Sequence, residues 1–220
     1  MNLLFNFIVE WMQAALTFFY NITVNLGVPN YGIAIILLTV VIKILLYPLT
    51  VKQVRSMKAM QELAPKMKAL QEKYKDNKEK LNVEIAGLYK NAGVNPFAGC
   101  LPLVVQMPFL IAIFYAIRDY NYVSNPSFLW INNLAQTSPS DPYYIIPILA
   151  AGTTYFSSRQ TTTEMTEQTK MMMMMMPLFI GYLTISFPAG LGIYWVMSNF
   201  VQIGQQWWLN RKAKVIGEAG

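Results

Sequence analysis

The sequence contains no histidine and only one cysteine, Cys100, in 220 residues. These absences exclude an intrachain disulfide, metal sites built from His and Cys ligands, and catalysis by a histidine base. Charge is also scarce, since charged residues make up 13% of the chain and hydrophobic residues 55%. No Asp or Glu lies within the long apolar runs, which disfavours proton-coupled pumps because these use intramembrane carboxylates. This balance indicates a polytopic membrane protein.

Five apolar runs are long enough, or nearly so, to cross a bilayer as helices, which requires about 20 residues. We expect membrane spans at about 31–51, 97–117, 143–158, 171–187 and 190–208. Segment 1–26 differs because its polar residues recur every three or four positions. This stripe predicts an amphipathic helix at the outer membrane interface, with a sixth span as the alternative. The predicted fold class is therefore all-α.

Positive charge is concentrated in segment 52–95, which has ten Lys and Arg and five Asp and Glu, or +5 of the total +6. Apolar residues recur there at threes and fours on both sides of a polar turn, which predicts a hairpin of two amphipathic helices. Short loops rich in Lys and Arg remain in the cytoplasm. We therefore expect the hairpin and the basic tail 209–220 inside and the N-terminus outside, with no nucleic acid as a specific ligand.

One charge interrupts the first predicted span. A lysine such as Lys43 costs about 2.5–3.5 kcal/mol within a span, so it either snorkels to the headgroups or serves a wet site. The mildly polar residues of the other spans can line such a site together with Lys43, although hydrogen bonding between helices explains most of them. Two rival functions stay open: a Ser–Lys hydrolase with Ser186 or Ser198 as nucleophile, and a small-solute transporter.

Several motifs follow one another in a fixed order. They are Lys43 before Tyr47-Pro48-Leu49-Thr50, Val94-Asn95-Pro96, Gly99-Cys100-Leu101-Pro102, Gln106-Met107-Pro108, Phe128-Leu129-Trp130-Ile131, Asp141-Pro142-Tyr143-Tyr144 and Phe187-Pro188-Ala189-Gly190. In this order they resemble the YidC insertases, bacterial relatives of the mitochondrial Oxa and chloroplast Albino proteins. The resemblance covers about residues 1–212. It implies five transmembrane helices around a hydrophilic groove that is open to the cytoplasm and closed on the outer side.

The resemblance also implies particular roles for residues. The matching groove positions and the substrate-facing positions of the last span are Thr39, Lys43, Gln106, Tyr194, Trp195 and Ser198. The expected contacts of the cytoplasmic hairpin are Arg55, Lys66 and Lys73. The groove charge of the family is usually an arginine, and Lys43 keeps the positive charge without the planar donor fork.

The family further implies a setting and a set of partners. Its members insert nascent membrane proteins into the bacterial cytoplasmic membrane, in contact with lipid, the ribosome, the signal-recognition targeting machinery and the Sec translocon. The resemblance predicts an insertase that is not an enzyme and needs no cofactor or metal.

Overall fold

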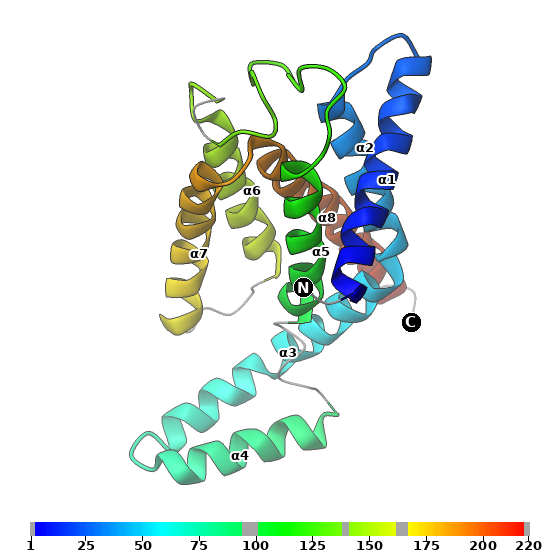
Figure 1. The fold of residues 1–220 in the computed structure, drawn as a ribbon. Coiled ribbons are helices and arrows are strands. Elements are labelled where there is room, and N and C mark those ends of the chain that lie inside the picture. The colour runs from blue at the N-terminus through cyan, green and yellow to red at the C-terminus, as the bar shows by residue number, and fades with distance from the viewer. Residues whose placement is uncertain (1–2, 94–100, 138–140, 162–166, 218–220) are drawn as a thin grey trace.

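The computed structural model describes residues 3–93, 101–137, 141–161 and 167–217 (Figure 1). Within these ranges the chain forms helices and their connections, and the only β-pairing there is one isolated bridge. The helices are α1 Leu3–Asn25, α2 Tyr31–Leu45, α3 Tyr47–Lys73, α4 Lys78–Asn91, α5 Leu101–Arg118, α6 Ile145–Thr161, α7 Glu167–Ser186 and α8 Ala189–Gly217. The all-α class predicted from the sequence is confirmed for these residues.

The run expected to form one helix over 31–51 is broken at Leu46. α2 ends at Leu45, α3 begins at Tyr47, and the two helices are bent by 62° at the break. Pro48 explains this break, because it lacks an amide hydrogen and its ring clashes with the carbonyl four residues earlier. The same proline is tolerated in the first turn of α3. The expected span over 31–51 is therefore divided between two helices, and its crossing of the membrane stays a prediction.

α3 and α4 form a hairpin that projects from one end of the molecule (Figure 1). Asn77 caps α4 by accepting a hydrogen bond from the amide of Lys80. Between the two helices, the Tyr89 hydroxyl donates to the Met67 sulfur at 3.1 Å. The end of the expected 52–95 segment, at residues 94–95, and the first residues of the expected 97–117 span lie outside the described residues.

The main hydrophobic core lies where α1, α2, α5 and α8 meet the 119–137 loop. Its fully buried members include Ile35, Ile113 and Leu134. α6 packs on α8, and α7 packs mainly on α6 (Figure 1). Gly192 of α8 permits this close approach, because a Cβ there would lie 2.3 Å from Ile146 Cγ2. The α6–α7 pair therefore attaches to the rest of the bundle largely through α8.

The helices α5 to α8 differ in length from the predicted spans. α6 has 17 residues and α7 has 20, or about 25 and 30 Å of helix. α8 continues without a break into the segment expected to form a basic tail.

Among the described residues, no helix alone is both long and apolar enough to cross a bilayer, whereas α2 and α3 together satisfy that test as a bent pair. Shorter apolar helical stretches cover Gln106–Arg118 and Met173–Ser186. The five spans stay a prediction.

α1 packs along the bundle, against α2 and α5. Its Met12 and Leu16 are buried, whereas Asn6 and Glu10 of the predicted polar stripe are exposed. In Figure 1 its C-terminal end lies with the long 119–137 loop, and its first residues lie toward the hairpin end. This direction is the one expected for the alternative of a sixth span, but α1 alone is not apolar enough to pass the test for a spanning helix. The outer interfacial position stays a prediction.

Candidate functional site

Lys43 lies in the last turn of α2 and is buried, with 7% of its surface exposed. Its ammonium group donates a hydrogen bond to Gln202 Oε1 of α8 at 3.3 Å. Nearby, the Gln205 side chain donates from Nε2 to the Lys43 carbonyl oxygen at 3.1 Å. Because the helix dipole favours cations at a C-terminus, this turn suits a positive charge. The break at Leu46 thus creates the helix end that holds Lys43.

A cavity of about 30 Å³ lies beside the lysine. It is lined by Lys43, Leu46, Leu49, Thr50, Gln53, Gln106 and Gln202. A volume of this size holds about two water molecules, and four of the lining residues offer them amide or hydroxyl partners. Gln205 Oε1 is also buried, and it has no hydrogen-bond partner among the described residues. The site is therefore polar, with one cation and several amides.

Gln106 connects this cavity to the centre of α8, since it lines the cavity and donates from Nε2 to the Tyr194 hydroxyl. Tyr194 is 1% exposed. Thr39 is fully buried one turn above Lys43, and its hydroxyl donates to the Ile35 carbonyl of its own helix at 2.6 Å. The structure thus brings Lys43, Gln106 and Tyr194 into one connected polar group, with Thr39 on the adjacent turn of α2.

Trp195 faces a different part of the molecule. Its indole nitrogen donates to the Thr154 hydroxyl of α6 at 2.9 Å. The Asn199 side-chain amide hydrogen-bonds with Thr154 and with Thr153, at 3.0 and 3.1 Å. These contacts form a second polar cluster, which joins α6 to α8. The structure therefore separates Trp195 from the adjacent Tyr194.

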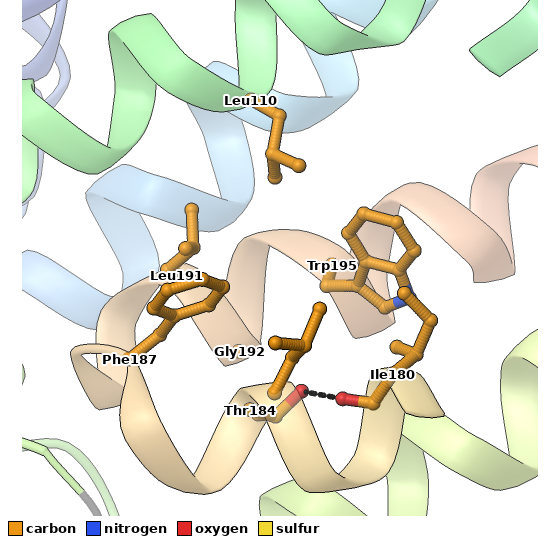
Figure 2. Close-up of a pocket in the computed structure, with 8 residues that line it drawn as sticks. Leu110, Ile180, Thr184, Phe187, Leu191, Gly192 and Trp195 are labelled. Carbon is orange, nitrogen blue, oxygen red and sulfur yellow. Dashed lines mark hydrogen bonds between the residues drawn. The ribbon is translucent and has the colours of Figure 1, made fainter. Parts of the chain in front are cut away.

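Trp195 also borders an apolar cavity of about 40 Å³. Figure 2 shows Leu110 of α5 facing Phe187 and Trp195 across it, while Thr184 hydrogen-bonds within α7. Ser198, the remaining predicted residue of α8, is buried. Of the six positions predicted for the groove, Trp195 lines this apolar space, and Lys43 and Gln106 line the polar one.

Sequence reasoning missed Gln53 and Thr50 as cavity residues, and it named Gln202 only among the mildly polar span residues that could line a wet site with Lys43. A signal for Gln202 was present, because it follows Tyr194 and Ser198 at intervals of four, which places all three on one helix face. For Thr50 and Gln53 the signal was weaker, since the bend between α2 and α3 decides which face of α3 meets the lysine.

The three predicted hairpin residues are exposed. Lys66 and Lys73 line a cleft of about 390 Å³ between α3 and α4, with Glu84 on its opposite side. Arg55 lies nearer the bundle on α3 and is not part of this cleft's lining. The hairpin thus presents both charges and half-buried apolar side chains to the solvent.

The family model described as "60Kd inner membrane protein" matches residues 21–216. The chain is 46% identical over 189 residues to the membrane protein insertase YidC of Caldanaerobacter subterraneus subsp. tengcongensis, covering 86% of this chain and 89% of that relative. The chain belongs to the YidC family of membrane protein insertases. A second YidC, from Syntrophus aciditrophicus, is 43% identical over 203 residues, which are 90% of this chain and 35% of that protein.

The fold matches a solved YidC structure as well. A crystal structure of an active YidC insertase, with its first transmembrane domain resolved, superposes with a TM-score of 0.72 at 26% identity, over 89% of this chain and 45% of that one. The relatives in this YidC family are named as insertases and not as enzymes. In agreement, no serine is among the residues that line the Lys43 cavity in the described part, and Ser186 is exposed at the end of α7. The hydrolase interpretation is not supported.

Proposed function

We propose that this chain inserts nascent membrane proteins by drawing an acidic side chain of a short hydrophilic client segment to the polar cavity at Lys43. The observation that carries this proposal is a buried ammonium group whose hydrogen-bond acceptor is the neutral amide of Gln202. The lining of the cavity includes no carboxylate among the described residues. The positive charge is therefore available to an acidic client side chain.

Electrostatics give this contact a useful strength. Two unit charges about 4 Å apart attract by about 4 kcal/mol at an effective dielectric constant of about 20. The amides and the hydroxyl of the cavity also hydrogen-bond to a client backbone that would otherwise lose its partners on leaving water. Transfer of the client's own apolar helix into lipid then drives release, at about 25 cal/mol per Å². Neither a nucleotide nor a metal enters this mechanism.

Closure of the outer side is supported by the packing above Lys43. Leu38, Ile42 and Thr39 are at most 4% exposed, and the next turns of α2 pack against α1, α8 and the 119–137 loop. We therefore expect a client segment to reach only partway through the bundle. The cavity itself is bordered by the first turns of α3, which lead to the hairpin.

The setting follows from the charge distribution and from the family. We place the hairpin and the C-terminal end in the cytoplasm and the 119–137 loop outside, with five spans in the bacterial inner membrane. The hairpin, through Arg55, Lys66 and Lys73, is the first contact for clients and for the targeting machinery. Nascent membrane proteins are the clients, and the ribosome and the Sec translocon are the partners.

The proposal is tested by substituting Lys43 and measuring client insertion into vesicles that contain only this protein. Two versions of one single-span client are compared, with and without acidic residues in the short outer segment. We expect Lys43→Arg to retain insertion, and Lys43→Ala and Lys43→Glu to reduce it for the acidic client, with Lys43→Glu the more severe. The neutral client should be affected less.

An exposed lysine on the hairpin supplies the control. Lys68→Glu makes the same charge change about 38 Å of helix away from Lys43, at an exposed position outside the three proposed hairpin contacts. Equal insertion of the acidic client by the Lys43→Glu and wild-type proteins would refute a role for the cavity charge.

A further inference from the structure

Two residues on the side of the bundle opposite the hairpin have an unusual backbone conformation. Leu129 and Tyr144 are the only non-glycine residues with a positive φ in the described part of the chain, both at 51°. This left-handed region is costly for residues with a Cβ and is held only where the surrounding structure fixes it. Both side chains are large, apolar or aromatic, and exposed, at 74% and 51%.

The turn that carries Leu129 is rigidly attached to the bundle. Phe128 and Ile131 exchange two backbone hydrogen bonds, at 2.9 and 2.8 Å, so Leu129 and Trp130 form a two-residue hairpin turn. Phe128 lies against the start of α2, where a Cβ on Gly32 would be 2.2 Å from the Phe128 ring, and Ile131 is 1% exposed. Glycine is the favoured residue at the position of Leu129 in such turns. An exposed leucine there implies a role for the side chain.

Asp141 ties this turn to the start of α6. Its carboxylate is buried and accepts hydrogen bonds from the Trp130 indole at 2.9 Å and from the Ile146 amide at 2.8 Å. The Tyr144 amide donates to the Asp141 carbonyl at 3.1 Å. A single buried residue thus fixes the positions from which both strained side chains emerge. The two exposed groups form one rigid unit.

The surroundings identify the partner as lipid. From residue 120 to residue 158 the sequence has one charged residue, Asp141, and it is buried. The adjacent exposed charges, Arg118 and Asp119, pair with each other, so this surface has little net charge to steer a charged protein. Tyr144 also begins an apolar exposed stripe that continues along α6 through Ile148, 67% exposed, and Phe156, 60% exposed, at multiples of four residues. In a membrane insertase family, an uncharged apolar helix face of this kind faces acyl chains.

We propose that Leu129 and Tyr144 form an anchor that inserts into the headgroup–acyl boundary of the outer leaflet and fixes the depth of α6 in the membrane. Leucine contributes apolar area, and tyrosine suits the boundary because one end is apolar and the other polar. Depth matters for α6 because its 17 residues span about 25 Å against a hydrocarbon core of about 30 Å. A short helix has no unique depth unless one end is held.

The test uses the full chain with Cys100→Ser and one introduced cysteine, at Leu129, Tyr144 or Asn125. Asn125 is the control because it is exposed on the same loop. Each cysteine carries an environment-sensitive fluorophore, and the protein is reconstituted into phosphatidylcholine–phosphatidylglycerol vesicles. We expect nitroxide-labelled lipids to quench the label at positions 129 and 144 at least about twofold more than at position 125, and iodide to show the opposite order.

A second pair of variants separates the anchor from the fold. Leu129→Gly supplies the residue that the turn favours, so thermal stability in detergent should be unchanged or higher. With Tyr144→Ser added, a label at Ile148 should become about twofold more accessible to iodide in vesicles and unchanged in detergent, because α6 has lost its anchor. If the label at position 148 is no more accessible to iodide in the double variant than in the wild-type chain, the proposal is overturned. So would iodide quenching at 129 equal to that at 125, or shielding of 129 from both quenchers, which would indicate a second copy of the chain on this surface.

Discussion

Replacing Gln202 by glutamate should disable the cavity without touching the lysine. The new carboxylate would lie where Gln202 Oε1 now accepts from the Lys43 ammonium, at 3.3 Å. At an effective dielectric constant of about 20, opposite unit charges at this distance attract by about 5 kcal/mol. Part of this gain is lost because the carboxylate must give up its hydration when buried. A net internal attraction of about 1–2 kcal/mol would still compete with the client.

That competition predicts a measurable loss. An attraction of about 1–2 kcal/mol corresponds to a factor of about 5–30. We expect Gln202→Glu to reduce the insertion rate of a client with acidic outer residues by this factor in proteoliposomes, and to leave a neutral client largely unaffected. Gln160→Glu is the matched control, since it makes the same change at an exposed position of α6.

A double variant that exchanges the side chains at positions 43 and 202 tests the role of the charge further. The double variant Lys43→Gln and Gln202→Lys keeps one cation and one amide in the cavity and moves the charge from α2 to α8. If the charge in the cavity attracts the client, the double variant should recover part of the activity that Lys43→Gln alone loses. Wild-type activity of Gln202→Glu, or no recovery in the exchange variant, would refute the assignment of Lys43 as an attractor of client carboxylates.

Three further predictions concern the bundle. Gly192→Ala places a methyl group within 2.3 Å of α6 and should lower the free energy of unfolding by about 1–3 kcal/mol. Gly204→Ala is the control, because no heavy atom lies within 4 Å of its new methyl group, and it should be neutral or stabilising. Thermal unfolding in detergent measures both variants. Asn199→Ala removes two hydrogen bonds between α6 and α8. Because such bonds average about 0.6 kcal/mol each, the free energy of unfolding should fall by about 1 kcal/mol in the same assay. A decrease smaller than the error of the assay would contradict this prediction. In a Cys100→Ser chain, a cysteine at Asn6 should react with an impermeant thiol reagent from outside if α1 is interfacial and only from inside if α1 is a sixth span.

The parts of the fold that follow from periodicity were predictable. Apolar residues at threes and fours gave the helices of the hairpin, and the polar turn near Asn77 marked its tip. The break at Leu46 was harder to predict, because Pro48 is compatible with either a kink or a new first turn. The sequence around Pro48 does not select between these two outcomes.

The sequence singles out Lys43 but not the residues that surround it, and the role of the site in receiving clients stays a prediction. Lys43 was identified because a charge in an apolar run is costly wherever the helix lies. Its partner is 159 positions away in the sequence, and the rotation of α8 selects that partner. Each residue turns the helix by about 100°, so Tyr194 faces Gln106 while the adjacent Trp195 faces α6. A list of polar residues in a span cannot supply that rotation.

The bend at Leu46 has a mechanical consequence for the hairpin. From the bend, α3 extends 27 residues, or about 40 Å, whereas Gln53 beside Lys43 lies only about 10 Å along it. A swing of about 5° at this joint displaces the far end of α3 by about 3.5 Å and Gln53 by less than about 1 Å. A movement of the hairpin about this joint would therefore leave the surroundings of Lys43 almost unchanged.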